Sequence, residues 1–206
     1  MIISDISYRR KGLCAVTADG KEYLLNAETA EAHGLRKGQQ IDRETIEKFS
    51  QESEYDRAKS RALWYLSRAD HSKKALKDKL CRAFSPDAAD AAVERMCELG
   101  LIDDVRYAQN VAQALARENK SQKEIMRKLF VKGVPNDIAK QAVEGLSCNA
   151  VEQICALLEK KYARRLHSED DLQKVYAALI RRGFSLSDVR AALKEYSVNI
   201  ENSEEW

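Results

Sequence analysis

The sequence contains few of the residues that interrupt helices, with only 8 glycines and 2 prolines among its 206 residues. Alanine, leucine, lysine, arginine and glutamate are abundant, so we expect helix over most of the chain. No stretch approaches the roughly 20 apolar residues that cross a membrane. The first residues also lack the basic segment and apolar core of a signal peptide. We therefore expect a soluble, cytoplasmic protein.

The sequence also lacks the motifs of the common enzyme and cofactor classes. It has neither of the glycine-rich loops that bind nucleotides, and no G-x-S-x-G element for a nucleophilic serine. Its five cysteines are scattered and form no C-x-x-C pair, which argues against a disulfide framework and a zinc site. Its three histidines stand apart from other metal-ligating side chains. We expect a protein that is not an enzyme and has no cofactor, metal or catalytic residues.

Three of the cysteines fall on apolar positions of expected helices: Cys81, Cys97 and Cys155. A free cysteine packs as a small hydrophobic side chain. We expect all three to be core residues.

Charge is plentiful and unevenly distributed. Charged residues make up 33% of the chain, compared with about 25% in an average domain. Residues 1–56 hold eight basic and eleven acidic residues, whereas residues 57–82 hold nine basic residues against two acidic ones. The net charge of +2 therefore hides a strongly basic segment.

The N-terminal part has the pattern of a small sheet followed by helices. Residues 2–25 contain strand-like segments, and Ala18-Asp19-Gly20 is a strong hairpin signal. Asn26 is placed to cap a short helix over residues 27–32. Asp42 is placed to cap a longer helix that starts at Arg43 and can continue toward Ala69.

From about residue 57 onward the chain repeats itself at an offset of 50 residues. Phe84, Val134 and Phe184 correspond, and so do Ala92, Ala142 and Ala192. One extra residue in the second copy shifts the upstream part by one position. Self-similarity at such a period is the sequence signature of stacked supersecondary units.

Each copy is expected to form three helices, because apolar residues recur at helical spacing between capping residues. The capping residues are Ser72 and Ser85-Pro86 in the first copy, Ser121 and Pro135-Asn136 in the second, and Asn149, Ser168 with Asp171, and Ser185 or Ser187 in the third. We expect a mainly α protein with three tandem three-helix repeats in an elongated curved array behind a small β-containing module. The expected domains are an N-terminal β/α module over 1–53, helical repeats over 54–102, 103–147 and 148–198, and an acidic tail over 199–206.

The pair Asp103-Asp104 admits two interpretations. The two carboxylates could ligate a metal ion, or they could cap the helix that follows Gly100-Leu101-Ile102. Acidic side chains are favoured at a helix N-terminus by the helix dipole. We therefore favour the capping role.

The remaining signal is positive charge on helical faces, which recurs in all three copies. The third copy contains Lys160, Lys161, Arg164, Arg165, Lys174, Arg181 and Arg182. Such charges are either an ordinary solvated surface or a basic track for a phosphate backbone or an acidic protein groove. A helix-turn-helix DNA reader fits poorly, because the helix that starts after Ser85 carries four acidic residues against Arg95 and would repel phosphates.

Several segments resemble the RecX family. Residues 62–80, ALWYLSRADHSKKALKDKL, are similar to the signature of the family's first repeat. Residues 98–108, ELGLIDDVRYA, resemble its most recognisable stretch. Residues 121–134 resemble the second repeat, and Gly34–Gln39 resembles a leader module of the longer members. The resemblance covers most of the chain.

The resemblance implies a regulator of RecA recombinase in recombination, DNA repair and the SOS response. Proteins of this family bind RecA filaments on single-stranded DNA and usually inhibit strand exchange and ATP hydrolysis. We expect a monomer that binds RecA, with direct binding of single-stranded nucleic acid as the alternative function and no membrane partner. The charge argument selects these partner-binding residues: Arg68, Lys73, Lys74, Lys77, Arg117, Lys120, Lys123, Arg127, Lys160, Lys161 and Arg164.

Overall fold

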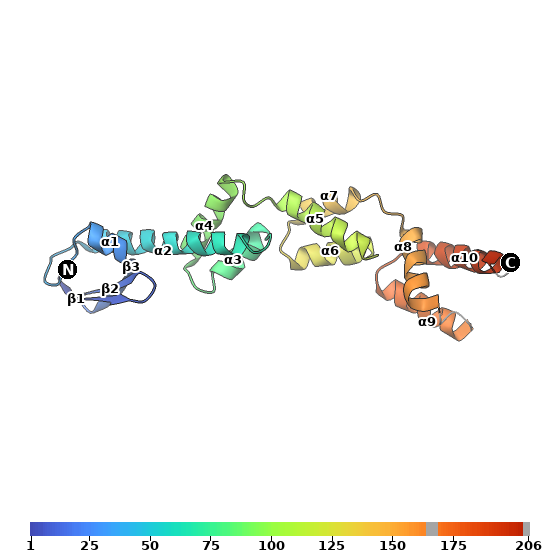
Figure 1. Cartoon of the computed structure of the whole chain (residues 1–206), viewed down its shortest axis with the longest axis horizontal. Coiled ribbons are helices and arrows are strands. Elements are labelled where there is room, and N and C mark those ends of the chain that lie inside the picture. Colours follow the sequence, from blue (N-terminus) through green and yellow to red (C-terminus); the bar gives the residue numbers. More distant parts are fainter. Residues whose placement is uncertain (164–168, 204–206) are drawn as a thin grey trace. The chain divides into compact units, whose positions relative to one another are not determined.

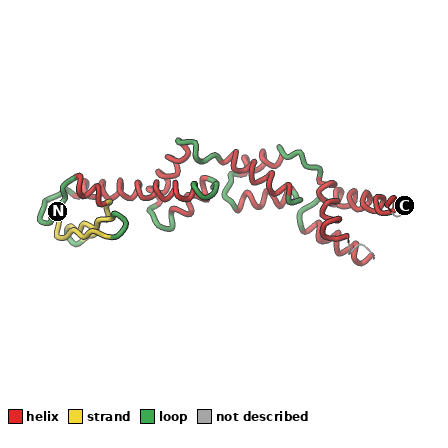
Figure 2. Tube along the Cα trace, in the orientation of Figure 1, coloured by secondary structure: helices red, strands yellow, loops and turns green. Residues whose placement is uncertain are grey.

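The computed structural model describes residues 1–163 and 169–203 (Figure 1). The chain divides into two compact units, Met1–Ile102 and Asp103–Trp206. Strands occur near the N-terminus, and helices follow along the rest of the described chain (Figure 2).

The first unit begins with a three-stranded antiparallel sheet in the order β1-β2-β3. The strands are β1 (Ile3–Arg9), β2 (Leu13–Ala18) and β3 (Lys21–Asn26). Asp19 and Gly20 have φ angles of 47° and 77°, as the tight hairpin turn between β2 and β3 requires. Val16 pairs with both Ile6 and Tyr23. The strands predicted within residues 2–25 are confirmed.

Two helices complete the N-terminal module, α1 (Ala27–Ala32) and α2 (Arg43–Leu66). Both start where the sequence predicts, but the side chains of Asn26 and Asp42 accept no capping hydrogen bond. The predicted capping contacts are therefore wrong. Along its 24 residues, α2 contributes Ile46 to the core of the sheet and Ala62 to the next core. A single helix thus joins two cores. The predicted boundary between the N-terminal module and the first repeat, between residues 53 and 54, lies within this helix.

The first repeat consists of the second half of α2 with α3 (Lys73–Leu80) and α4 (Pro86–Glu98). Ser72 Oγ accepts a hydrogen bond from Ala75 N at 3.1 Å, and Ser85 Oγ accepts one from Ala88 N at 3.4 Å. Both predicted N-caps are confirmed. The core of this repeat is a cluster of fully buried side chains that includes Leu76, Leu80 and Met96.

The second repeat consists of α5 (Asp104–Arg117), α6 (Gln122–Val131) and α7 (Asn136–Glu144). Asp103 Oδ1 accepts hydrogen bonds from Val105 N and Arg106 N at 2.9 and 3.0 Å. The capping interpretation of this acidic pair is therefore confirmed for Asp103. Ser121 caps α6 by accepting a hydrogen bond from Glu124 N at 3.2 Å.

The third repeat consists of α8 (Ala150–Leu157), a π-helical turn η1 (Leu158–Tyr162), α9 (Glu169–Arg181) and α10 (Leu186–Ser203). Asn149 caps α8 through Val151 N at 3.0 Å, and Ser185 caps the start of α10 through Asp188 N at 3.0 Å. The predicted capping residue Ser168 lies outside the described residues.

Three separate hydrophobic clusters lie in the three repeats, and matched positions occupy matched places in them. Ala92, Ala142 and Ala192 are all buried. The mainly α fold with three three-helix repeats behind a small sheet is therefore confirmed. The predicted domain boundaries remain a prediction. Within residues 1–163 and 169–203, no helix has the length and apolarity needed to cross a membrane.

The cysteine prediction is only partly right. Cys97 and Cys155 are half-buried and pack against the cores of the first and third repeats. Cys81 is exposed, because α3 ends at Leu80 and Cys81 occupies the position just after it. Burial raises the pKa of the Cys155 thiol, and the nearby carboxylate of Glu195 raises it further.

Candidate partner-binding surface

In the first repeat, two of the predicted cations form ion pairs within the repeat. Lys73 Nζ lies 2.6 Å from Glu94 Oε1, and Lys77 Nζ lies 2.6 Å from Asp90 Oδ1. The hydrogen bond to Asp90 raises the pKa of Lys77. The acidic α4 thus neutralises part of the lysine-rich α3.

The other two predicted residues of the first repeat are exposed. Lys74 has no ion-pair partner among the described residues. The guanidinium of Arg68 lies 4.3 Å from the ring centroid of Trp64, a cation–π contact at the end of α2. These two cations are therefore more available to a partner than Lys73 and Lys77.

In the second repeat, Lys120 is partly neutralised and two other cations are not. Glu124 lies 3.3 Å from Lys120 and 3.9 Å from Lys128. Lys123 and Arg127 lie one turn apart on α6, are exposed, and form no ion pair with any described residue.

Lys123 and Arg127 line a pocket of about 300 Å³ together with Arg181 and Arg182 at the end of α9. We call it the α6–α9 pocket. Among the described residues that line it, Glu124 is the only acidic one, and its carboxylate is close to Lys120 and Lys128. The pocket therefore carries an excess of positive charge that suits a carboxylate or a phosphate.

Ser121 holds the two sides of this pocket together. Its Oγ accepts the capping hydrogen bond of α6 and donates one to the carbonyl oxygen of Arg182 at 2.5 Å. Gly183 has a φ of +90°, and a Cβ at this position would lie 2.9 Å from Ser121 Oγ and 3.0 Å from Lys123 Cβ. Only glycine allows the end of α9 to approach α6 so closely.

The arginines of this pocket are held in place by their own helix and its neighbours. Arg181 Nε donates to the carbonyl oxygen of Ala177 at 3.4 Å, and the guanidinium of Arg182 lies 5.9 Å from the ring centroid of Tyr162. The sequence showed both as basic, but the charge argument did not select them. The sequence signal that could have selected them is the glycine that follows a basic residue in both Lys132-Gly133 and Arg182-Gly183.

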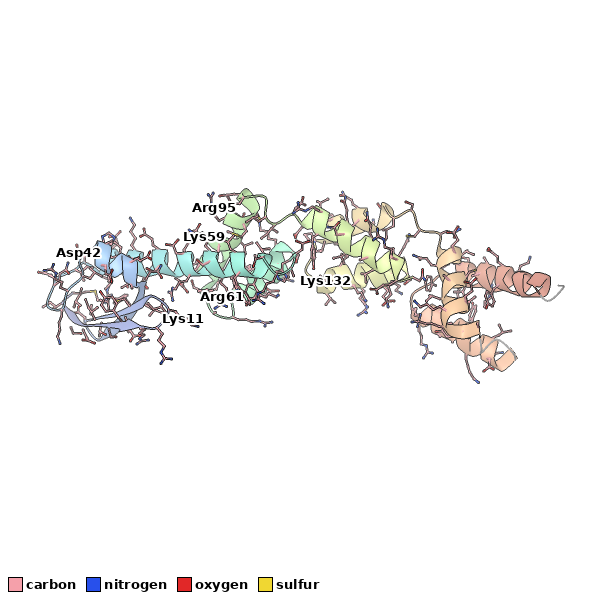
Figure 3. All side chains as sticks on the ribbon, in the orientation of Figure 1. Lys11, Asp42, Lys59, Arg61, Arg95 and Lys132 are labelled. Carbon is pink, nitrogen blue, oxygen red and sulfur yellow. The ribbon has the colours of Figure 1, made fainter. Side chains whose placement is uncertain are left out.

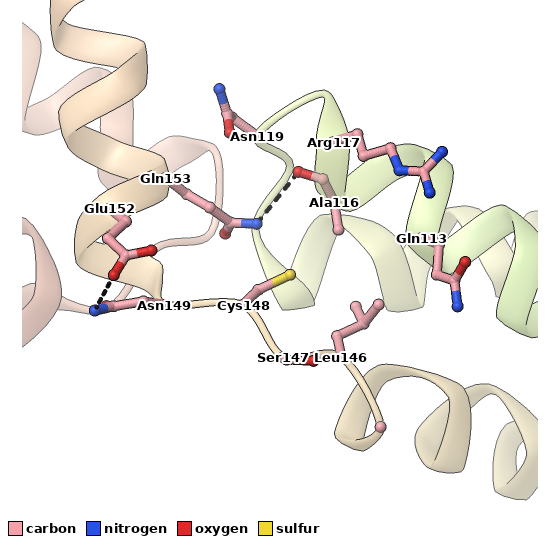
Figure 4. Close-up of a pocket in the computed structure, with 11 residues that line it drawn as sticks. Gln113, Ala116, Arg117, Asn119, Leu146, Ser147, Cys148, Asn149, Glu152 and Gln153 are labelled. Carbon is pink, nitrogen blue, oxygen red and sulfur yellow. Dashed lines mark hydrogen bonds between the residues drawn. The ribbon is translucent and has the colours of Figure 1, made fainter.

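Arg117 lines a different pocket, of about 550 Å³, where α5 meets the start of α8 (Figure 4). Gln153 Nε2 donates to the carbonyl oxygen of Ala116 at 3.4 Å, and Asn149 Nδ2 donates to Glu152 Oε1 at 3.2 Å. Arg117 and Glu152 are the charged side chains that line it. With one charge of each sign, this pocket has no preference for an anion.

The two described residues predicted in the third repeat, Lys160 and Lys161, do not line either pocket. Lys160 and Lys161 are exposed on the π-helical turn. Arg164 lies outside the described residues. Among the described residues, no group of three or more His, Cys, Asp or Glu side chains is arranged to hold a metal ion.

Comparison with known proteins identifies the first and third repeats. The model of the RecX first three-helix domain matches residues 58–96, and that of the RecX third three-helix domain matches residues 149–193. The regulatory protein RecX of Prosthecochloris aestuarii is 31% identical over 150 residues, which are 72% of this chain and 99% of that protein. The regulatory protein RecX of Caldanaerobacter subterraneus is 29% identical over 198 residues, 94% of this chain and 98% of that one.

Solved structures share the fold. A crystal structure of a regulatory protein RecX is similar with a TM-score of 0.66 at 23% identity, over 94% of this chain and 98% of that chain. The crystal structure of RecX from Lactobacillus salivarius is similar with a TM-score of 0.63 at 25% identity, over 70% of this chain and 97% of that chain. The matched repeats and the relative that is 31% identical over nearly its whole length show that this chain belongs to the RecX family of regulatory proteins.

Proposed function

We propose that this protein binds RecA recombinase filaments on single-stranded DNA and inhibits their recombinase and ATPase activities in recombination and DNA repair. Membership of the RecX family carries the proposal. The α6–α9 pocket supports it with a physical means of contact, because its four cations suit the carboxylates of an acidic protein groove.

The pocket is suited to a protein carboxylate in two respects. Arginine presents a planar fork of N–H donors that can bind both oxygens of a carboxylate, and Arg127, Arg181 and Arg182 bring three such forks together. Phe130 and Val131 follow Arg127 on α6 within about one turn, and each is 74% exposed. Aromatic and arginine side chains that become buried together dominate the energy of many interfaces.

The test is the RecA ATPase rate on single-stranded DNA at increasing concentrations of this protein. We expect the rate to fall and then to level off at saturation. The double variant Lys123→Glu/Arg127→Glu should need at least about tenfold more protein for the same inhibition, because close charge pairs at interfaces couple by more than about 1.4 kcal/mol.

The matched control is Arg106→Glu/Lys140→Glu, which makes the same change in net charge in the same repeat at exposed positions outside the pocket. It should inhibit like the unaltered protein. An unchanged ATPase rate at saturating protein would rule out the proposed function. Equal loss in the two double variants would rule out the pocket and leave only a general charge effect.

The reversal of Lys73 and Lys77 is a poorer test, although both residues are predicted to bind a partner. Each reversal would place a carboxylate against Glu94 or Asp90. The fold of the first repeat and the binding surface would then change together.

The alternative function, direct binding of single-stranded nucleic acid, is supported by a different part of the molecule. An exposed tryptophan lies between arginines in a groove of the first unit. Binding of nucleic acid to this groove can be measured without RecA.

A further inference from the structure

The first unit contains a groove of about 920 Å³ between the N-terminal module and the first repeat. One wall is the turn between β1 and β2 with the start of α1, and the other is the C-terminal half of α2 (Figure 3). The side chains that decide its chemistry are Lys11, Arg57, Lys59, Arg61, Trp64 and Phe84. None of these was selected from the sequence as a binding residue.

The α2 wall presents a regular stripe of cations around one aromatic ring. Within α2, Arg57, Arg61 and Trp64 follow one another at steps of four and three residues, which places them on one helix face, and Arg68 lies in the turn just after α2. The guanidiniums of Arg61 and Arg68 lie 5.5 and 4.3 Å from the ring centroid of Trp64. From Arg57 to Trp64 the stripe extends for about 10 Å along the helix axis.

Trp64 remains accessible despite these contacts. It is 44% exposed, although a tryptophan usually buries most of its large apolar surface. Its ring also meets Tyr65 edge-on at 5.2 Å between centroids. The exposed part of the indole is aromatic surface on which a further flat ring can stack.

Hydrogen bonds hold the walls of the groove in place. Ala27 N donates to the carbonyl oxygen of Gly12 at 2.8 Å, which fixes the turn against the start of α1. The carboxylate of Glu54 accepts hydrogen bonds from Ser85 N and Ser85 Oγ at 2.8 and 2.9 Å. This carboxylate holds the loop that carries Phe84 against α2.

The groove has an excess of positive charge. Four cations line it against two carboxylates, Glu28 and Asp56. Asp56 is paired with Lys59 at 2.8 Å. Lys11 and Arg61 form no ion pair with any described residue, and both are exposed. A ligand with regularly spaced negative charges would therefore be attracted along the groove.

We propose that this groove binds single-stranded nucleic acid, with one base stacked on Trp64 and the neighbouring phosphates held by Arg61 and Lys11 in the groove and by Arg68 beside Trp64. This inference goes beyond the proposed RecA contact and does not depend on it. It assigns a role to the N-terminal module, whose turn supplies Lys11 on the wall opposite α2.

The combination of one aromatic ring with a cationic stripe favours a single strand over the other polyanions. Base–aromatic stacking with a basic groove along the backbone is the general mode of single-strand binding. A duplex keeps its bases stacked on each other, so Trp64 would gain nothing from it. An acidic peptide would use the arginines and leave the indole without a flat partner ring.

The sequence has two tryptophans, Trp64 and Trp206. The test uses the full chain with the substitution Trp206→Phe, which leaves Trp64 as the source of tryptophan fluorescence. The probes are oligothymidylate and oligouridylate of about 16 nucleotides, a duplex of the same length, and polyglutamate. We expect both single strands to quench the fluorescence of Trp64, and the tighter of the two identifies DNA or RNA as the ligand. The duplex and polyglutamate should bind at least about tenfold more weakly and leave Trp64 unquenched.

Matched variants separate stacking from charge and are made in the unaltered chain. Trp64→Ala should weaken binding of a labelled oligothymidylate at least about tenfold, whereas Trp64→Phe should keep most of it. Tyr8→Ala removes another exposed aromatic ring of the same unit and should have no effect. In a plot of the logarithm of the binding constant against the logarithm of the salt concentration, Arg61→Gln should make the slope shallower by about 0.7. Arg43→Gln on the same helix should leave this slope unchanged.

Equal binding by Trp64→Ala and the unaltered protein would overturn the proposal, provided that circular dichroism shows the same helix content. Equal affinity for polyglutamate would overturn it in favour of an acidic protein as the occupant. RecA is absent from this assay, so a failure of the protein to bind single-stranded nucleic acid would leave the proposed RecA function standing. A negative result in the RecA ATPase assay would in turn leave the groove proposal standing, because only the oligonucleotide assay tests the groove.

Discussion

The α3–α4 layer of the first repeat and the α6–α9 pocket of the second unit have similar basic sequences and different electrostatics. In the first, the lysines at positions 73 and 77 face carboxylates at 2.6 Å. In the second, Lys123 and Arg127 face Arg181 and Arg182. A basic helix is therefore available to a partner only where its neighbours do not neutralise it.

Matched positions of the repeats explain this difference. Asp90 and Glu94 on α4 correspond to Lys140 and Glu144 on α7, so repeat 2 has a cation where repeat 1 has the carboxylate that pairs with Lys77. With the one-residue shift upstream, Lys123 corresponds to Lys74. Lys74 and Lys123 are both exposed, and neither forms an ion pair with any described residue.

The largest expected effect comes from adding a Cβ at Gly183, where the end of α9 lies close to α6. Gly183→Ala should lower the free energy of unfolding by about 2–3 kcal/mol, from left-handed strain and from overlap with Ser121 and Lys123. Gly100→Ala is the matched control, since Gly100 has a φ of +67° with nothing within 4 Å of its Cβ position. It should cost about 1–2 kcal/mol. Urea unfolding followed by circular dichroism measures both, and equal losses would contradict the close approach.

The next effect is on partner binding and compares the two regions directly. Lys123→Gln/Arg127→Gln should weaken binding to RecA filaments at least about tenfold. Lys73→Gln/Lys77→Gln should weaken it less than about threefold, because these lysines already have partners. Co-sedimentation with filaments measures both affinities. A larger loss from the α3 variant would reverse the comparison.

A smaller effect should follow when the first repeat is made to resemble the second. Asp90→Asn/Glu94→Gln removes the carboxylates that pair with Lys77 and Lys73, and should raise affinity for heparin by a few-fold. Elution from heparin should then require more salt. Asp5→Asn/Asp70→Asn removes the same two negative charges elsewhere in the first unit. If the two variants elute together, net charge alone sets the affinity.

The smallest effect is a pH dependence in the first repeat. The hydrogen bond from Lys77 to Asp90 raises the pKa of Lys77 above the ordinary lysine value. The folded state therefore gains stability that is fully present below the ordinary lysine pKa and is lost as the pH rises through the raised one. Lys77→Gln should be slightly less stable at neutral pH, and the difference in Tm from the unaltered protein should shrink as the pH rises through the raised pKa of Lys77. A difference that stays constant would show that the pair contributes no pH-dependent stability.

Local chemistry was predictable from the sequence for several helix caps, whose contacts span a few residues, although Asn26 and Asp42 accept no capping hydrogen bond. Ser72, Ser85 and Ser121 cap their helices as predicted, because each hydroxyl accepts from a backbone N–H three residues ahead. The prediction for Cys81 was wrong because the apolar periodicity continues for one residue beyond the last residue of α3. Periodicity alone does not show where a helix ends.

The sequence by itself determined the repeat, the helix starts and the family, since these follow from apolar spacing, capping residues and matched motifs. It also located the positive charge. Only the tertiary structure decided which cations are neutralised, because Lys77 and Asp90 belong to different helices, and Lys123 and Arg181 come from different repeats. The physical reason is that an ion pair forms at a few ångströms in space, whereas sequence patterns record only neighbours along a helix.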